Sequence, residues 1–542
     1  MLWAGLRDAD ARRTRALGER CGPRSPHLGH CSLPEARLGR APVKADWSRI
    51  EPAVFLSSAA VVVLVLAFGV IDPDSAKAVF LGLQDWIVGT FGWLFVGSTA
   101  FFLVFSIWCT LGTRGRLRLG PEGEAPDFPL HSWFAMLFSA GMGIGIMFFG
   151  VAEPVMHYSS PPSAAVGSAQ AAQQAMTITF YHWGLHAWGV YTVMGLAIAY
   201  FGHRRGLPLA IRSTLYPLLG DRIHGWIGHS VDVFAVFGTL FGLATSLGLG
   251  AMQINAGLHR LFGTAESTGV QVGLIALITA GATTSVVLGL DKGIRRLSEL
   301  NVALATLLLL FVAAAGPTLV LVEAFPAHIF DYLVALVPFS TGYEQLGDGE
   351  WQKSWTLFYW AWWIAWSPFV GMFIARISRG RTIREFVLGV LLVPTLVSFL
   401  WFTVFGWSAI TLDAQSPGIA TAVATDLSTG IYALLDRLPA AGMTSLLAAL
   451  VVAIFFITSS DSGSFVVDML TSGGDPDPPI WQRVFWAVSE GVIAAVLLVA
   501  GGLAALQSAA INTGLPFCVI LLFVCLGLGR ALREEGRASR SG

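Results

Sequence analysis

Residues 139–154 read SAGMGIGIMFFGVAEP, a stretch in which four glycines precede a glutamate–proline pair. Glycine weakens a helix because its backbone readily leaves the helical conformation, and proline removes a backbone donor. Within a bilayer, backbone groups freed in this way cannot face lipid unpaired and must line a protein cavity or water. The stretch therefore predicts an interrupted helix beside an internal cavity. Close packing of helices through Gly141 and Gly145 is the alternative explanation for those two glycines.

The composition of the whole chain indicates a membrane protein. Of 542 residues, 55% are hydrophobic and 12% are charged, whereas soluble domains hold about 25% charged residues. The hydrophobic residues form long runs, and roughly 20 apolar residues in a helix cross the hydrocarbon core. These features predict an all-α integral membrane protein. The net charge of −1 offers no bulk attraction for nucleic acid, so we expect no nucleic-acid partner.

The apolar runs predict twelve transmembrane helices within a membrane domain of residues 51–529. The spans are expected near 52–70, 86–109, 132–157, 174–201, 231–259, 270–290, 298–322, 354–378, 385–410, 440–470, 481–501 and 504–528. A stretch at 327–337 is too short to cross and predicts an amphipathic helix on the membrane surface. Residues 1–50, which are rich in arginine and poor in apolar residues, predict a disordered cytoplasmic tail. Residues 530–542 are expected to form a short cytoplasmic tail.

The placement of basic residues sets the expected orientation. On one side of the predicted spans, the connections hold only four basic residues, which are Lys77, Arg260, Lys353 and Arg437. The two tails and the connections on the other side hold the remaining lysines and arginines. Because basic residues are retained on the cytoplasmic side during insertion, we expect both termini in the cytoplasm and a plasma (inner) membrane location.

A second span also contains helix-weakening residues. Residues 366–371 read WSPFVG, which puts a proline and a glycine inside span 354–378. Span 132–157 opens one block of five predicted spans, and span 354–378 opens the next. Interrupted spans at matching positions of two halves are typical of transporters with inverted repeats and a binding site near the membrane midplane.

Aromatic residues concentrate in two spans. Residues 351–366, WQKSWTLFYWAWWIAW, contain six of the 19 tryptophans. Span 174–201 adds Trp183, Trp188 and Tyr191, which fall within roughly a 140° arc of a continuous helix at about 100° per residue. Ring faces attract a cation that hydrogen bonds cannot satisfy, such as trimethylammonium. The pattern predicts a site for a quaternary ammonium compound, with packing between helices as the alternative for span 174–201.

The run SWTLFYWAWW at 354–363 and the glycine stretch that ends in Glu153 and Pro154 resemble signature segments of the betaine/carnitine/choline transporter family. The resemblance covers about residues 50–530. It implies the LeuT-type fold, with two N-terminal helices and two inverted five-helix repeats at about 132–322 and 354–528. It also implies a transporter rather than an enzyme, and a homotrimer in membrane lipid. The helix near 327–337 would contribute to contacts between protomers.

The resemblance further implies which residues hold the substrate. Trp183, Trp188, Tyr191 and Trp363 would form an aromatic box. The substrate pathway and the glycine stretch would add contacts from Trp362, Trp366, Met142, Gly143 and Gly145. Choline carriers of the family tend to have aspartate where this chain has Gly145. A glycine there favours a zwitterion with its own carboxylate, such as glycine betaine, dimethylsulfoniopropionate or carnitine, and backbone amides of the glycine stretch would meet that carboxylate.

Sodium is the coupling ion that the resemblance implies. Sodium is a hard cation that requires oxygen ligands, and residues 454–462 read IFFITSSDS. By analogy with sodium-coupled relatives, the hydroxyls of Thr458 and Ser459 and the carbonyl of Phe455 would meet the carbonyls of Ser139 and Met142. The alternative is that such hydroxyls bond back to their own helix.

A second sodium ion would use Thr239 and Phe369 in the family pattern. This chain departs from that pattern at Leu243, where a hydroxyl is expected one turn beyond Thr239. Sodium-independent exchangers of the family place a fixed positive side chain in this region, and the segment around Thr239 holds no lysine or arginine. Sodium-independent exchange and proton-coupled uptake of choline or carnitine are the alternatives, with His182 and His186 as the proton carriers.

Two carboxylates, Glu153 and Asp461, lie inside predicted spans. Burying a charge is costly, so such residues are candidates for function. For Glu153 we expect a structural role as an acceptor of backbone hydrogen bonds from the broken helix, and for Asp461 both roles are open. A channel or receptor could use the same aromatic box without accumulating substrate. The spans contain no nucleophile–base pair or metal motif that would predict an enzyme.

The short C-terminal tail predicts a carrier without strong osmotic activation.

Overall fold

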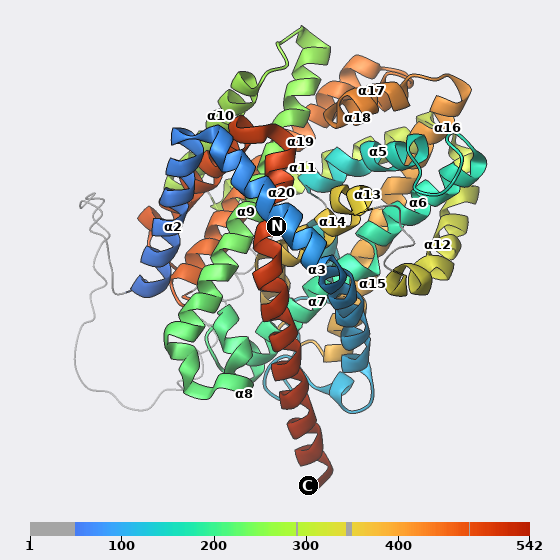
Figure 1. Cartoon of the computed structure of the whole chain (residues 1–542). Coiled ribbons are helices and arrows are strands. Elements are labelled where there is room, and N and C mark those ends of the chain that lie inside the picture. Colours follow the sequence, from blue (N-terminus) through green and yellow to red (C-terminus); the bar gives the residue numbers. More distant parts are fainter. Residues whose placement is uncertain (1–48, 142, 289–290, 343–348, 476, 542) are drawn as a thin grey trace, which may run out of the picture.

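The computed structural model describes residues 49–541 except 142, 289–290, 343–348 and 476. Within these residues every regular element is helical and no strand is present. Eleven of the described helical segments are long and apolar enough to cross a membrane. The predicted all-α membrane class is therefore confirmed, and Figure 1 shows the helices gathered in one bundle.

The helices vary widely in length. The longer ones are α2 (Pro52–Ile71), α3 (Pro73–Thr110), α4 (Leu130–Gly141), α5 (Ile144–Ser159), α6 (Ala169–Trp183), α7 (Leu185–Ala199), α9 (Trp226–Phe262), α10 (Thr268–Leu288), α11 (Asp291–Ala315), α12 (Thr318–Thr341), α14 (Thr356–Ile377), α15 (Ile383–Phe402), α19 (Ala441–Thr471) and α20 (Ile480–Ser541). Short helices in the connections are α8 (Tyr216–Leu219), α13 (Gly349–Ser354), α16 (Ser408–Gln415), α17 (Ile419–Thr425) and α18 (Gly430–Leu435).

Burial separates central helices from peripheral ones. The most apolar windows of the spans that contain α7 and α14 are 94% and 89% buried within the protein, whereas that of α12 is 17% buried. α14 packs against α7, α9 and α20. In Figure 1, α2 and α12 lie at opposite edges of the bundle, with α14 between them. The central helices therefore form the protein-lined interior of the bundle.

The interruption predicted at the glycine stretch is confirmed. α4 ends at Gly141 and α5 begins at Ile144. Gly143 precedes α5 with an extended backbone, at φ −166° and ψ −172°. Met142 lies outside the described residues. The chain thus leaves the helical conformation at the point where glycines make that departure inexpensive.

The interruption predicted at 366–371 is wrong. α14 runs without a break from Thr356 to Ile377, with Pro368 inside the helix. Proline lacks the N–H that would bond the carbonyl oxygen of Ile364, four residues earlier. The hydroxyl of Ser367 donates to that oxygen at 2.8 Å and takes the place of the missing bond. The helix is continuous because a side chain satisfies the freed carbonyl.

A break that the sequence analysis did not anticipate divides predicted span 174–201. Gly184 separates α6 from α7, with φ −92° and ψ −142°. A Cβ atom at this position would lie 2.5 Å from the carbonyl oxygen of Phe180 and 2.8 Å from Oη of Tyr332. The same Tyr332 hydroxyl accepts a hydrogen bond from the backbone N–H of Leu185 at 3.0 Å. The expectation that Trp183, Trp188 and Tyr191 lie on one continuous helix is therefore also wrong, because Trp183 ends α6 and the other two belong to α7.

Two predicted boundaries need correction. Span 298–322 ends earlier, because α11 stops at Ala315 and α12 begins at Thr318. α12 is 24 residues long, so the segment that contains 327–337 is long and apolar enough to cross a membrane. The chain leaves the helical conformation at Pro317, with φ −78° and ψ 62°.

The end of the chain also departs from the expected pattern. α20 includes both predicted spans 481–501 and 504–528. Its backbone leaves the helical conformation between them, at Gly501 and Gly502. Gly502 has φ 59° and ψ −138°, a conformation that favours glycine. Helix α20 then continues into the predicted C-terminal tail, where Glu535 accepts a hydrogen bond from Nε of Arg204 at 2.6 Å. Residues 1–48 of the predicted N-terminal tail lie outside the described residues.

Candidate substrate site

A cavity lies between the helices that flank the two breaks. About 470 Å³ of space there is not filled by protein atoms, a figure that includes solvent at the open side of the cavity. Its lining comes from α5, α6, α7, α14 and α15 and consists of Gly143, Gly145, Ile146, Trp183, Ala187, Trp188, Tyr191, Trp362, Trp363, Trp366, Val370 and Ser398. None of these described residues is charged, so aromatic rings dominate the surface that a ligand would meet.

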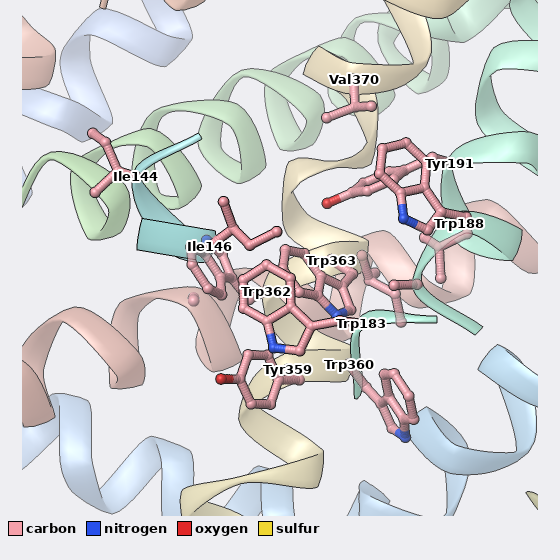
Figure 2. Close-up of a cluster of buried hydrophobic side chains, with 14 of the residues drawn as sticks. Ile144, Ile146, Trp183, Trp188, Tyr191, Tyr359, Trp360, Trp362, Trp363 and Val370 are labelled. Carbon is pink, nitrogen blue, oxygen red and sulfur yellow. The ribbon is translucent and has the colours of Figure 1, made fainter. Parts of the chain in front are cut away.

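Four of the lining rings form the predicted box. Trp183 and Trp363 meet with ring centroids 4.9 Å apart at 72°. Tyr191 lies 6.1 Å from Trp363 at 74°, and Trp188 lies 5.3 Å from Tyr191 at 72°. Figure 2 shows Trp188 and Tyr191 on one segment and Trp183 and Trp363 close together beside them. Nearly perpendicular rings present both faces and edges to one space, which suits a ligand with several methyl groups.

The break at Gly184 contributes directly to this geometry. The last carbonyls of a helix have no partner within it, and the carbonyl oxygen of His182 is one of these at the end of α6. The indole N–H of Trp363 donates to that oxygen at 3.0 Å. The broken helix therefore fixes one wall of the cavity through a backbone group that a continuous helix would have used internally.

A stacked row of rings follows α14 away from the box. Trp362 stacks on Trp363 at 4.9 Å and 13°, and on Trp366 at 6.1 Å and 19°. Phe369 continues the row at 5.5 Å from Trp366. The structure thus brings Trp362 and Trp366 into the lining. Their assignment to a substrate pathway stays a prediction.

Two glycines of the predicted site differ in the space beside them. A Cβ atom on Gly145 would lie 2.9 Å from the ring of Trp362 and 3.2 Å from that of Trp183. A Cβ atom on Gly143 would have no neighbour within 4 Å. At position 145, therefore, any side chain would push apart two indoles of the cavity.

Glu153 lies behind the box and is fully buried. Its Oε2 accepts hydrogen bonds from Nε1 of Trp183 at 2.7 Å and from the hydroxyl of Tyr359 at 2.5 Å. Its Oε1 lies 2.7 Å from Nδ1 of His182 and 3.3 Å from Nε2 of His157. The expectation that Glu153 accepts backbone hydrogen bonds is therefore corrected, since its partners are side chains of α5, α6 and α14.

Sequence reasoning missed His157 and the connection from Glu153 to the box. The only available signal was the spacing of four between Glu153 and His157, which places two side chains on one helix face. The other predicted histidine, His186, lies elsewhere. Its Nε2 is 2.8 Å from the hydroxyl of Ser340, and its ring packs against Trp360 with centroids 5.6 Å apart.

The residues predicted to bind the first sodium ion lie on α4 and α19. The hydroxyl of Thr458 lies 3.0 Å from the carbonyl oxygen of Ile454 and 3.2 Å from that of Phe455, so it bonds within its own helix. Ser459 is half-buried and Phe455 is buried. Ser139 belongs to the last turn of α4, and Met142 lies outside the described residues. Whether these groups share an ion stays a prediction.

The residues predicted for a second ion lie where α9 meets α14. Thr239 is fully buried, and its hydroxyl has no hydrogen-bond partner among the described residues. The neighbouring Gly238 is so close to α14 that a Cβ atom would lie 2.6 Å from the carbonyl oxygen of Ala365. Phe369, on α14, is half-buried. Thr239 is thus a buried oxygen that lacks a partner beside the helix that lines the cavity.

Comparison with known proteins matches these features to a family. A family model for betaine/carnitine/choline family transporters matches residues 53–537. The chain is 47% identical over 491 residues to a glycine betaine transporter of Acinetobacter baylyi, which covers 90% of this chain and 74% of that protein. It is 45% identical over 488 residues to the glycine betaine transporter OpuD of Bacillus subtilis, covering 90% and 95%. It is 44% identical over 507 residues to a glycine betaine/proline/choline transporter of Vibrio parahaemolyticus, covering 90% and 91%.

These matches span every helix that lines the cavity, including both breaks. The matched proteins are transporters rather than enzymes, and all three relatives are named as transporters of glycine betaine. Together with the helical membrane fold, these matches make this protein a multi-pass membrane transporter. The chain belongs to the betaine/carnitine/choline transporter family.

Proposed function

We propose that this protein imports a glycine betaine-like zwitterion across the plasma membrane together with sodium. The observation that carries the proposal is the box of Trp183, Trp188, Tyr191 and Trp363 around one uncharged cavity. A quaternary ammonium group cannot donate hydrogen bonds, so electron-rich ring faces are the favourable surroundings for it inside a protein. Relatives at 44–47% identity that are named as glycine betaine transporters support this substrate class.

The lack of room for a side chain at Gly145 supports a zwitterion over a simple cation. No described lining residue carries a charge, and a side chain at position 145 would collide with Trp183 and Trp362. A choline-like cation would thus enter without a carboxylate in the lining to balance it, whereas glycine betaine brings its own. The ammonium end would lie among the rings, and the carboxylate end would face the backbone of the glycine stretch.

Sodium coupling is supported by the chemistry of the oxygen atoms near the break. A hydroxyl donates one proton and keeps lone pairs that can bind a cation. The hydroxyl of Thr458 donates within α19, which leaves its lone pairs available, and α19 packs against α5. Thr239 offers a further buried hydroxyl without a partner among the described residues. The proposed ligands of the first sodium ion are the hydroxyls of Thr458 and Ser459 and the carbonyls of Phe455, Ser139 and Met142. Thr239 and Phe369 are proposed for a second ion.

The proposed architecture is the LeuT-type arrangement of two five-helix repeats after two N-terminal helices, with both termini in the cytoplasm. We also propose a homotrimer in which α12 contributes to protomer contacts. Leu319 and Phe330 on this helix expose 81% and 66% of their surface in the single chain. Chemical cross-linking of the purified protein in lipid, followed by mass determination, tests the trimer.

Uptake into proteoliposomes that contain the purified protein tests the transport proposal. Labelled glycine betaine is expected to accumulate when external sodium exceeds internal sodium, and to stop accumulating when potassium replaces sodium. Unlabelled carnitine, dimethylsulfoniopropionate and choline would be added as competitors. Equal accumulation in potassium would contradict sodium coupling, and stronger competition by choline than by betaine would contradict a zwitterionic substrate.

The same preparation separates the remaining mechanisms. Exchange without sodium would appear as uptake that requires preloaded substrate, and proton coupling would appear as uptake driven by an imposed pH gradient alone. A channel or receptor would show equilibration or binding without accumulation. Each of these results would replace the sodium mechanism while leaving the aromatic site in place.

A further inference from the structure

Glu153 touches the aromatic box without lining the cavity. Its two oxygens face four donors, from Trp183, Tyr359, His182 and His157, at 2.5–3.3 Å. An ionised carboxylate is an acceptor only, with about four lone-pair sites. The four donors therefore match the capacity of the charged form of Glu153.

The partners of the two histidines are compatible with two neutral rings. If Nδ1 of His182 donates to Glu153, its Nε2 accepts a hydrogen bond from the hydroxyl of Thr356, 2.9 Å away. His157 faces Glu153 with Nε2, and its Nδ1 has no partner among the described residues. A buried nitrogen without a partner costs less as a bare acceptor than as a charged donor. With tautomers assigned from these partners, the cluster carries one net negative charge.

The indole of Trp183 connects that charge with the cavity. Its N–H donates to Oε2 of Glu153 at 2.7 Å. Its six-membered ring reaches the lining beside Gly145, where a Cβ atom would lie 3.2 Å from Cη2 of Trp183. Hydrogen bonds to a charged acceptor are strong and polarise the donor, particularly in a low-dielectric interior. The bond shifts electron density toward the ring that the ligand meets.

We propose that the Glu153 carboxylate makes the aromatic box prefer a quaternary ammonium over a neutral group of the same shape, acting through the indole N–H of Trp183. The inference rests on the proposed function, because it assumes that the box holds the ammonium end of the substrate. Glu153 is a positioning and polarising residue that touches no substrate. Its charge strengthens the attraction between ring and cation without occupying space in the cavity.

Two other roles use the same side chains. The ligand atoms of Glu153, His157 and His182 lie within 4.8 Å of one another, as they would in a metal site. A metal ion held by Oε1 and the two histidine nitrogens would replace the contacts between them, while the hydrogen bonds of Trp183 and Tyr359 to Oε2 could remain. A purely structural role would join α5, α6 and α14 without changing charge selectivity.

An analogue of glycine betaine with an uncharged tert-butyl group in place of the ammonium separates these roles. In tert-butylacetate a quaternary carbon replaces the quaternary nitrogen, so the shape and the carboxylate are retained and only the positive charge is lost. Inhibition of labelled betaine uptake by each compound gives two inhibition constants in the same proteoliposomes. The ratio of the two inhibition constants reports the preference of the site for a positive charge. Effects of a substitution on carboxylate binding or on sodium binding change both constants alike and cancel in the ratio.

Glu153→Gln is the main variant. The glutamine carbonyl can still accept hydrogen bonds from Trp183 and Tyr359, while its amide donates to histidine nitrogens that change tautomer. We expect the inhibition constant of betaine to rise about ten-fold or more, the order expected for loss of one charge near a buried cation. The constant of tert-butylacetate should change less than about three-fold. Equal changes for both compounds would leave Glu153 with only a structural role and overturn the inference.

Trp183→Phe provides a second route if Glu153→Gln is not recovered folded. It keeps an aromatic ring and removes the N–H, so the preference for charge should fall, and adding Glu153→Gln should lower it little further. An additive loss in the double variant would show that the carboxylate acts by another path. Loss of the wild-type preference after chelation with EDTA would identify a metal ion and overturn the proposal.

The wild-type protein distinguishes failure of this inference from failure of the proposed function. If betaine and tert-butylacetate inhibit uptake equally in the wild type, the box does not bind a cation and the proposed substrate site fails. If the wild type prefers betaine and Glu153→Gln retains that preference, only the role of Glu153 fails.

Discussion

The indole N–H of Trp363 donates to the carbonyl oxygen of His182 at 3.0 Å. Two helices distant in sequence, α14 and α6, meet through this bond at the edge of the substrate cavity. The carbonyl is available because α6 ends at Trp183 and α7 starts again at Leu185. One break in one helix therefore shapes the box twice, since it sets the path of α7 and provides an acceptor for a ring of α14.

The break at Gly184 should tolerate no side chain. In Gly184→Ala the new Cβ would meet the carbonyl oxygen of Phe180 at 2.5 Å, and overpacking of this kind costs about 1–3 kcal/mol. We expect lower thermal stability in detergent and weaker betaine binding. Gly97→Ala on α3 is the matched control, because a Cβ there has no neighbour within 4 Å. Similar melting temperatures for the two variants would contradict this account of the break.

Trp363 should contribute far more to binding than another buried tryptophan of the same helix. Trp363→Leu retains an apolar side chain and removes the ring, so the KM for betaine should rise roughly 30-fold, equivalent to about 2 kcal/mol of desolvated cation–π attraction. Trp360→Leu is the control, since Trp360 is fully buried and packs on Tyr181 and His186 instead of the cavity. It should lower stability with KM within about three-fold of the wild type. An equal rise in KM for both variants would remove Trp363 from the site.

Two glycines only two residues apart should respond differently to alanine. Gly145→Ala places a methyl group 2.9 Å from Trp362 and 3.2 Å from Trp183, so the box must open and betaine affinity should fall about ten-fold or more. Gly143→Ala adds a methyl group with no neighbour within 4 Å and should leave affinity within about three-fold. Binding would be followed by the quenching of tryptophan fluorescence. Retained affinity in Gly145→Ala would show that the cavity does not close around these two rings.

Ser367 should stabilise α14 more than an ordinary helix serine stabilises its helix. In Ser367→Ala the carbonyl of Ile364 loses the hydroxyl that substitutes for the missing Pro368 N–H, and an unsatisfied buried acceptor costs about 1–3 kcal/mol. Ser106→Ala on α3 removes a comparable buried hydroxyl bonded to the carbonyl of Phe102 at 2.8 Å. That carbonyl has a regular helical partner, so the cost should be smaller. Thermal unfolding in detergent would measure the stability of both variants. Equal destabilisation would contradict the view that the Ser367 hydroxyl replaces the missing backbone hydrogen bond.

Thr458 should affect sodium dependence more than stability. Thr458→Val keeps the size of the side chain and removes the oxygen, so the sodium concentration for half-maximal uptake should rise about ten-fold or more. Thr444→Val on the same helix is a close control, because its hydroxyl also lies near two carbonyls of its own helix, at 3.2 Å from those of Ala440 and Ala441. The sodium requirement of Thr444→Val should match the wild type. Unchanged sodium dependence in Thr458→Val would exclude this hydroxyl as a ligand.

The membrane class, most spans and the break at 141–143 followed from the sequence because they depend on local properties. Bilayer thickness sets the length of an apolar helix, and a run of glycines lowers the cost of leaving it whatever lies nearby. Trp183, Trp188 and Tyr191 could be proposed from the sequence because aromatic rings suit a methylated ammonium, whereas Trp363 is assigned to the box through the family resemblance.

Only the tertiary structure decided which other helices break and what lies behind the box. Pro368 leaves α14 intact because Ser367 satisfies the freed carbonyl, while α6 ends before Gly184 where Tyr332 accepts the N–H of Leu185. The four donors on Glu153 come from three helices, and apart from the spacing of four between Glu153 and His157 no pattern in the sequence brings them together. A backbone or carboxylate group in a membrane interior must find a partner. Which partner it finds depends on packing between distant segments, and this determines the shape and the charge of the site.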